Sequence, residues 1–139
     1  MNAVRDPIRG SCLCGQIRYE IRGSLGPASH CHCSMCRKAH GAAFGSYSRI
    51  RHADFAWLAG ADRVVSYESS PGVSRTFCGR CGSTLQYITA NRPESFALAL
   101  GTVDDDPGIR ASHHMFVGSK APWYEIGDSL PRYEADDAG

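Results

Sequence analysis

Short runs in which apolar and polar residues alternate dominate this chain. In residues 16–21, Ile17, Tyr19 and Ile21 occupy one phase and Gln16, Arg18 and Glu20 occupy the other. A period of two is typical of a half-buried β-strand. Similar runs predict further strands over residues 28–33, 42–50, 64–68, 73–78, 83–89, 95–100 and 112–117.

Turn residues separate these runs and limit the length of each element. The sequence Ser-Ser-Pro-Gly at residues 69–72 lies between two predicted strands and predicts a hairpin. Residues 34–40 are too few for a full amphipathic helix, so we expect one helical turn or a loop there. With 15 glycines, seven prolines and no long helical pattern, the sequence predicts a mainly β fold with short strands and little helix. We expect a single domain over residues 1–139, with loose ends at about 1–8 and 134–139.

The seven cysteines fall into three closely spaced groups. Two groups are pairs, a CxC and a CxxC. The third packs three cysteines into six residues. In chain order the groups are Cys12 and Cys14; Cys31, Cys33 and Cys36; and Cys78 and Cys81. A buried structural cysteine needs no companion at a fixed interval, so this spacing indicates metal binding.

The cysteines divide as four plus three. The two pairs supply four thiolates from distant segments, which is the usual composition of a closed, structural zinc site. The group in the middle supplies three, which leaves a coordination position open to water or substrate. We therefore predict two zinc ions per chain, a structural one and a functional one. Iron–sulfur ligation is the less favoured alternative, because a site drawn from separate CxC and CxxC elements is more often zinc.

Composition and charge narrow the possible functions. Hydrophobic residues make up 42% of the chain and charged residues 21%, and the net charge is +1. This charge gives no electrostatic argument for a nucleic-acid partner or an anionic membrane. No apolar run is long enough to cross a bilayer, and no export signal is evident. An odd number of cysteines at metal-ligand spacing argues against disulfides. We expect a cytoplasmic protein.

The three cysteine segments and the residues around them resemble one known family. They have the sequences Gly-Ser-Cys-Leu-Cys-Gly, Cys-His-Cys-Ser-Met-Cys-Arg-Lys and Phe-Cys-Gly-Arg-Cys-Gly-Ser, and His-Met-Phe-Val and Lys-Ala-Pro-Trp-Tyr-Glu-Ile follow near the end. The series is similar to the glutathione-dependent formaldehyde-activating enzyme family, also called the CENP-V/GFA domain, over nearly the whole chain. The resemblance implies a zinc-bearing Mss4-like β fold.

The same resemblance implies ligand sets and an activity. Cys12, Cys14, Cys78 and Cys81 match the structural zinc ligands, and Cys31, Cys33 and Cys36 match the ligands of a functional zinc. The implied activity is that of a carbon–sulfur lyase or synthase, which acts on the adduct of glutathione with formaldehyde or a related aldehyde. A second hypothesis is a non-catalytic zinc module that binds glutathione or a protein partner. A nucleic-acid zinc ribbon is disfavoured because no basic stripe is present.

Candidate catalytic residues lie around the middle cysteine group. Arg37 follows it directly and is a candidate for charge compensation or for contact with a glutathione carboxylate. His40 and His114 are candidates for a fourth ligand or a proton carrier. His30 and His32 alternate out of phase with Cys31 and Cys33, so we expect them to point away from that metal. Arg75 and Arg80 flank the CxxC, where compensation of the four-thiolate charge is the simpler role.

Overall fold

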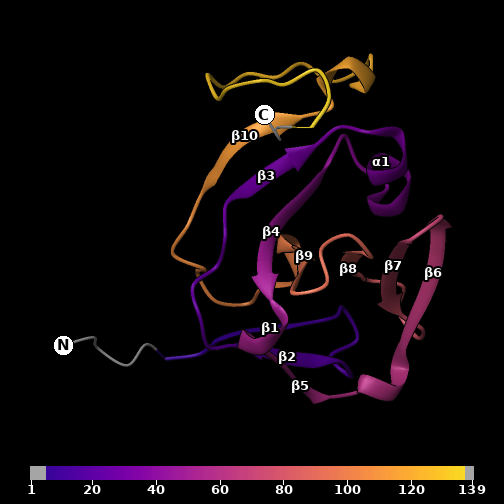
Figure 1. The fold of residues 1–139 in the computed structure, drawn as a ribbon, viewed down its shortest axis with the longest axis vertical. Helices are drawn as coiled ribbons and strands as arrows, with labels where there is room; N and C mark the ends of the chain where they lie inside the picture. The colour runs from indigo at the N-terminus through magenta and orange to yellow at the C-terminus, as the bar shows by residue number, and fades with distance from the viewer. Residues whose placement is uncertain (1–5, 137–139) are drawn as a thin grey trace.

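The computed structural model describes residues 6–136 and consists of two β-sheets and one α-helix within that range (Figure 1). The smaller sheet has the order β1 (Ile8–Ser11), β2 (Arg18–Ile21) and β5 (Phe55–Ala59). The larger sheet has seven strands. Its order is β10 (Ala111–Met115), β3 (Ala28–Cys31), β4 (Gly45–Arg51), β9 (Ser95–Ala99), β8 (Thr84–Thr89), β7 (Val73–Cys78) and β6 (Val64–Ser70).

Neighbouring strands are antiparallel, except that β10 runs parallel to β3. The helix α1 (Ser34–His40) connects β3 to β4. Four single 3-10 turns complete the regular structure of the described range, at His52–Asp54, Ala61–Arg63, Leu100–Thr102 and Val117–Ser119. Across residues 6–136, no helix has the length and apolar character that a membrane span requires.

The mainly β prediction and the predicted hairpin are confirmed. β6 and β7 pair as antiparallel neighbours around the turn at residues 71–72. Two details differ from the prediction. The strand β1 was not predicted, because it contains one large apolar residue, Ile8, and its second inward position is Gly10. Gly10 lies opposite Tyr19 of β2, and the Tyr19 ring fills the space that a side chain at residue 10 would need.

The second difference is α1, which is a seven-residue helix instead of a single turn or loop. Its caps explain its length. The Cys33 sulfur accepts a hydrogen bond from the Cys36 amide at the N-terminus, and Gly41 ends the helix with a left-handed φ of 60°. Inside the helix, the buried Cys36 anchors one face.

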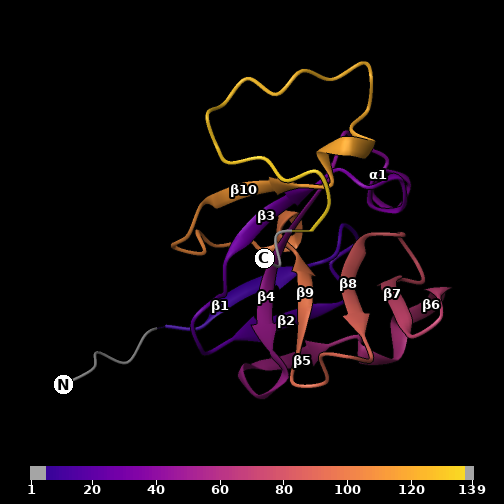
Figure 2. The ribbon, with the colours of Figure 1, turned by 45° about the horizontal axis from the view of Figure 1, so that its top comes forward.

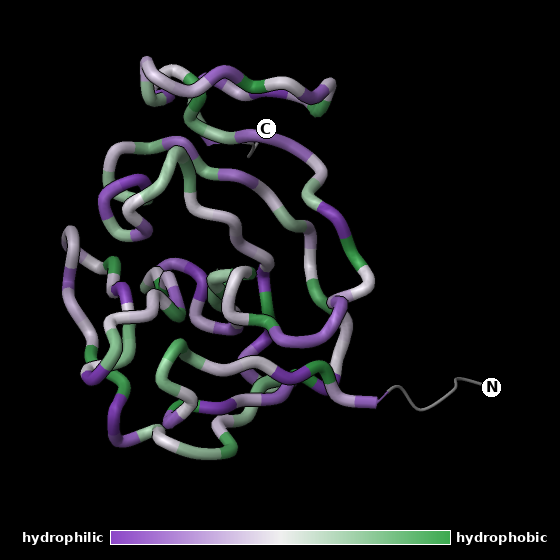
Figure 3. Tube along the Cα trace, turned by 180° about the vertical axis from the view of Figure 1, so that it is seen from behind, coloured by the Kyte–Doolittle hydropathy of each residue, from purple (hydrophilic) through white to green (hydrophobic). Residues whose placement is uncertain are grey.

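The main hydrophobic core lies between the two sheets. Tyr19 and Ile21 from the smaller sheet meet Ile50, Phe96 and Leu98 from the larger one, and all five side chains are fully buried. Two smaller clusters contain the cysteines: one packs Cys12 and Cys78, and the other packs Cys31 and Cys36. Short hydrophilic and hydrophobic stretches follow one another along the trace (Figure 3), whereas β5 (FAWLA) and β9 (SFALA) are almost wholly apolar.

The C-terminal segment runs beside the edge strand β10 (Figure 2). The amide of His114 donates to the carbonyl of Pro131, and the amide of Tyr133 donates to the carbonyl of His114. Further along, the amide of Phe116 donates to the carbonyl of Ala135. The chain is therefore hydrogen bonded as far as residue 135. Residues 1–5 and 137–139, part of the ends expected to be loose, lie outside the described residues.

Candidate metal centres and cavity

The first centre is the group of four cysteines, Cys12, Cys14, Cys78 and Cys81, whose sulfurs all lie within 4.8 Å of one another. The Sγ atoms of Cys12 and Cys14 are 3.5 Å apart, and those of Cys14 and Cys78 are 3.9 Å apart. Four sulfurs bound to one zinc at about 2.3 Å would be separated by about 3.8 Å. The four sulfurs therefore fit a tetrahedral zinc site.

Backbone geometry holds this group in place. The amide of Ile17 donates to the Cys12 sulfur at 3.3 Å, and the amide of Cys81 donates to the Cys78 sulfur at 3.4 Å. Such bonds orient ligands and stabilise thiolate charge. Gly15 and Gly82 follow the two pairs with φ values of 79° and 80°, in the left-handed region that glycine adopts without strain. The group therefore places the turn between β1 and β2 of the small sheet next to the turn between β7 and β8 of the large sheet.

The second centre contains the other three cysteines, and all three come from one short segment. Cys31 ends β3, Cys33 caps α1, and Cys36 lies within the helix. Their sulfurs lie within 4.8 Å of one another, and no other cysteine, histidine, aspartate or glutamate of residues 6–136 joins the group. Three sulfur donors without a fourth protein ligand fit the donor set of a zinc site that keeps one open position.

The three closely spaced thiols of this group have different pKa values. Hydrogen bonds from Cys31 and then Cys36 hold the pKa of Cys33 well below its ordinary value. The same contacts, Cys33 first, raise the pKa of Cys31 far above it. One thiolate is therefore favoured while the others resist ionisation, and a shared divalent cation is what would allow all three to ionise.

A cavity of about 660 Å³ opens beside the three-cysteine group. Its floor is one face of the large sheet, built from alternate residues of the strands. Six strands contribute side chains to this floor: β3 (Ser29 and Cys31), β4 (Tyr47 and Arg49), β9 (Ala97), β8 (Tyr87 and Thr89), β7 (Arg75) and β10 (His113 and Met115). The period of two along each strand thus decides which side chains reach the cavity.

Sheet register brings a row of these residues together. Arg49 pairs with Ala97, Ala97 with Tyr87, and Tyr87 with Arg75, across β4, β9, β8 and β7. The position of Arg75 therefore differs from the prediction. It was expected beside the four-cysteine site because Cys78 is close in sequence, but its side chain lies at the three-cysteine group. Alternation along β7 and the pairing with β8 cause this difference.

Arg75 joins a chain of hydrogen bonds that ends at the cysteines. Its Nη1 and Nη2 atoms each lie 3.8 Å from the Cys36 sulfur, and Nη1 donates to the Tyr47 hydroxyl at 3.3 Å. That hydroxyl also lies 2.8 Å from Nε2 of His40. His40 therefore reaches the group through Tyr47 and Arg75 and contributes no ligand atom to it. Burial, then the charge of Arg75, lowers the pKa of His40, which favours the neutral imidazole.

The opposite face of β3 and β10 carries a separate cluster of histidines. As alternation predicts, His30 and His32 point away from the cysteines: Nδ1 of His30 lies 2.8 Å from the Ser46 hydroxyl, and Nε2 of His32 lies 2.8 Å from Nδ1 of His114. The second nitrogen of His114 lies 3.0 Å from a carboxylate oxygen of Asp128. His114 is thus engaged away from the three-cysteine group.

His32 and His114 of this cluster are fully buried. Burial, then repulsion from His114, lowers the pKa of His32 to about 4. His114 lies between the two groups: its Nδ1 is 2.8 Å from Nε2 of His32 and its Nε2 is 3.0 Å from the Asp128 carboxylate. Because Asp128 lies in the C-terminal segment, the interaction ties that segment to β10.

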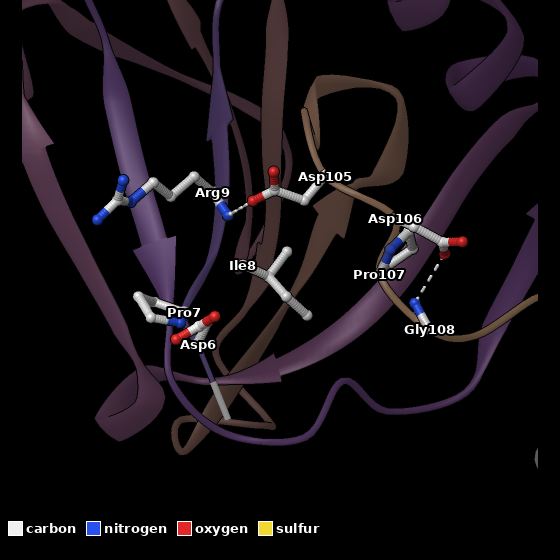
Figure 4. Close-up of a pocket in the computed structure, with 8 residues that line it drawn as sticks. All are labelled: Asp6, Pro7, Ile8, Arg9, Asp105, Asp106, Pro107 and Gly108. Carbon is white, nitrogen blue, oxygen red and sulfur yellow. Dashed lines mark hydrogen bonds between the residues drawn. The ribbon is translucent and has the colours of Figure 1, made fainter. Parts of the chain in front are cut away.

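The candidate Arg37 and a group of aspartates lie apart from the cavity. Arg37 does not line it, and the Nε atom of Arg37 is buried without a hydrogen-bond partner among residues 6–136. Asp105 and Asp106 border a separate pocket beside β1 (Figure 4). There Asp105 accepts from the Arg9 amide, whereas Asp106 accepts from the Gly108 amide and pairs with Arg110. The two carboxylates therefore take part in separate local interactions.

Comparison with known proteins agrees with this geometry. The family model described as glutathione-dependent formaldehyde-activating enzyme matches residues 7–119. The chain belongs to this family. The matched region includes all seven cysteines and every strand of both sheets.

The chain is similar to proteins from several organisms. A protein of Halomonas elongata with the provisional name glutathione-dependent formaldehyde-activating enzyme is 31% identical over 127 residues, which are 86% of this chain and 80% of that protein. An uncharacterized lyase of Schizosaccharomyces pombe is 23% identical, over 92% of this chain and 91% of its own length. A crystal structure of a Rhodobacter sphaeroides protein has a TM-score of 0.60 at 23% identity, over 74% of this chain and 91% of that one, and shares the fold.

Proposed function

We propose that this protein forms, and in reverse cleaves, the carbon–sulfur bond between glutathione and formaldehyde or a related small aldehyde. The observation that carries the proposal is the position of Cys31, Cys33 and Cys36, which gather three sulfurs at the cavity wall. A site with three protein ligands and access to a cavity has the architecture of catalytic zinc. Membership of the family and the name of the Halomonas elongata relative support the substrates.

We infer that each chain holds two zinc ions, one on each cysteine group. Zinc bound by Cys31, Cys33 and Cys36 would supply a Lewis acid that ionises an incoming thiol at neutral pH. The chain itself provides the remaining requirements of the reaction. The cavity holds the tripeptide and its aldehyde partner, and the apolar wall formed by Ala97 and Met115 excludes water from the sulfur.

The charge of the cavity suits glutathione. Arg49, Arg75 and Arg92 line it, and Asp136 is the acidic residue among its described lining side chains. Glutathione carries two carboxylates and one ammonium group, so its net charge is negative and complements this excess of arginine. The volume of about 660 Å³ lies in the usual range for small-molecule sites.

The activity would make the protein a carbon–sulfur lyase or synthase, depending on the direction in which it works. We also infer a cytoplasmic location. All seven cysteines are free thiols in the structure, and a reducing compartment preserves thiols for metal binding.

The test combines metal counting with a screen of thiols and aldehydes. Purified protein is expected to contain two zinc ions and to accelerate the formation of S-hydroxymethylglutathione above its spontaneous rate, followed by NMR exchange between the free and bound species. Cys33→Ser is the informative variant, because serine keeps an N-cap for α1 while it removes one sulfur. We expect this variant to remain folded and to lose the acceleration.

Unchanged turnover in a folded Cys33→Ser variant would contradict the proposal. A wild-type protein that holds two zinc ions and binds glutathione, yet accelerates no thiol–aldehyde pair, would favour the non-catalytic zinc module. A control with zinc in solution and no protein separates acceleration by the cavity from acceleration by the free metal.

A further inference from the structure

Arg75 combines burial, positive charge and access to the cavity. Only 8% of the residue is exposed, and it lines the cavity beside the three-cysteine group. Its guanidinium lies 4.8 Å from the centre of the Tyr87 ring, and Nε donates to the Ser69 hydroxyl at 3.2 Å. These contacts come from two strands, β8 and β6, and orient the guanidinium next to the Cys36 sulfur.

The charge of Arg75 has no carboxylate partner within the described part of the chain. Its partners there are two hydroxyl groups, an aromatic ring and the Cys36 sulfur. Burying an unpaired guanidinium costs several kcal/mol, so an anion is needed close to it. Nη1 and Nη2 of Arg75 each lie 3.8 Å from the Cys36 sulfur at the cavity wall, so an anion bound in the cavity beside that sulfur would meet this charge.

The hydrogen-bonding capacity of Arg75 is not exhausted by these partners. A guanidinium has five N–H donors. One bond from Nε, two from Nη1 and one from Nη2 account for four of them within residues 6–136. The remaining N–H belongs to Nη2, the same atom that contacts the Cys36 sulfur. A donor is thus available next to the point where a substrate sulfur would react.

We propose that Arg75 is a catalytic residue that donates a hydrogen bond to the aldehyde oxygen as this oxygen becomes negative. The inference rests on the proposed function. In the reaction, a bond forms between the glutathione sulfur and the aldehyde carbon while the carbon–oxygen π bond breaks, and its electron pair moves to oxygen. The proton that the thiol loses is returned to that oxygen through solvent. Arg75 stays protonated throughout and stabilises the intermediate alkoxide.

The position of Arg75 favours this oxygen over a glutathione carboxylate. In the adduct the oxygen is separated from the glutathione sulfur by a single carbon. A glutathione sulfur on the same zinc as Cys36 would lie about 4 Å from the Cys36 sulfur, so the Arg75 donor that contacts Cys36 would be within reach of the adduct oxygen. Both carboxylates of glutathione are at the far ends of the tripeptide. Arg49 and Arg92 line more distant parts of the cavity wall on β4 and after β8, and they are the better placed cations for those groups.

The experiment compares Arg75→Gln and Arg75→Lys with Arg51→Gln, which changes an exposed arginine of β4 outside the cavity. Loss of one preorganised donor to an oxyanion typically lowers kcat by about 100- to 1,000-fold. We expect a loss of this size in Arg75→Gln, a smaller one in Arg75→Lys, which keeps the charge but not the fork, and none in Arg51→Gln. The loss is expected to be equal with glutathione and with 2-mercaptoethanol, which has no carboxylate.

Two measurements that do not depend on activity complete the test. Glutathione affinity by calorimetry and zinc affinity by chelator competition are both expected to stay within a few-fold of wild type in Arg75→Gln. A loss confined to glutathione would assign Arg75 to carboxylate binding, and a loss of zinc would assign it to charge compensation. Either result overturns the proposal.

The outcome for the wild-type protein separates this inference from the function on which it rests. Wild-type turnover with unchanged kcat in Arg75→Gln would refute the role of Arg75 alone, whereas a wild type without turnover would refute both. If Arg75→Gln fails to fold, Arg75→Lys decides the question, because lysine retains the charge and the aliphatic stem. A kcat equal to wild type in that variant would then refute the proposal.

Discussion

Replacing one cysteine in each group should distinguish a zinc ion that stabilises the fold from a zinc ion that takes part in the reaction. Cys78 is 1% exposed and packs with Ile17 and Leu85 in a core cluster. Its site joins residues 12–14 of the small sheet to residues 78–81 of the large one. Cys33 instead belongs to a site made within residues 31–36, so the metal there closes no long loop.

The expected magnitudes follow from this difference. A structural zinc site contributes about 10–16 kcal/mol of binding free energy, against a total stability of about 5–15 kcal/mol for a typical domain. Cys78→Ser should therefore abolish cooperative folding. In Cys33→Ser, serine still caps α1, a role worth about 0.5–2 kcal/mol. We expect this variant to lose one zinc and to change its free energy of unfolding by no more than about 2 kcal/mol.

The assay is urea unfolding followed by circular dichroism, with zinc counted by elemental analysis on the same samples. Wild type should contain two zinc ions and Cys33→Ser should contain one. Cys78→Ser should show no cooperative unfolding transition. The reasoning would be refuted if Cys78→Ser unfolded near the wild-type midpoint, or if Cys33→Ser were as unstable as Cys78→Ser. Treatment of wild type with a strong chelator should reproduce the Cys78→Ser result.

Three further substitutions test contacts outside the two cysteine groups. Phe96→Ala, in the fully buried core between the sheets, should lower the free energy of unfolding by about 3–5 kcal/mol in urea titrations; a loss below 1 kcal/mol (about one hydrogen bond) would mean that the sheets do not share this core. Tyr19→Phe removes a 2.6 Å hydrogen bond to Thr102 and should cost about 1 kcal/mol, whereas an unchanged midpoint would contradict that bond. Asp128→Ala removes the partner of His114 and should speed amide exchange in residues 130–133 without changing that of β4, and equal exchange would show that the contact does not hold the C-terminal segment.

The sequence was sufficient to predict elements that depend on local pattern. Alternation predicted the strands, and the Ser-Ser-Pro-Gly turn predicted the β6–β7 hairpin. Spacing predicted both cysteine groups, because a CxxC places its two sulfurs together wherever the rest of the chain goes. The phase of alternation also predicted that His30 and His32 would face away from the cysteines.

Features that depend on sheet register could not be predicted from the local sequence pattern. Arg75 reaches the three-cysteine group because β7 pairs with β8 so that Arg75 lies opposite Tyr87, and β8 pairs with β9. Nothing in residues 73–78 alone indicates that pairing. The strand β1 was missed for a related reason: Gly10 is inward-facing, but its place in the core is filled by the Tyr19 ring, and a glycine gives no hydrophobic signal.

The two centres differ in how they are built, and this difference has a functional consequence. The four-cysteine group draws on two distant segments, so any movement of its ligands would require the sheets to part. The three-cysteine group depends on one short segment, and its surroundings, Tyr47, Arg75 and Ala97, belong to a rigid sheet that is held by the main core. If a thiol binds as proposed, its sulfur would meet ligands from the segment that joins β3 to β4, whereas the arginine and the cavity floor belong to strands of the large sheet. Under the proposed mechanism, the sulfur would therefore bind at one element of the fold and the oxygen would meet a charge held by another, which is the preorganised arrangement that such a reaction requires.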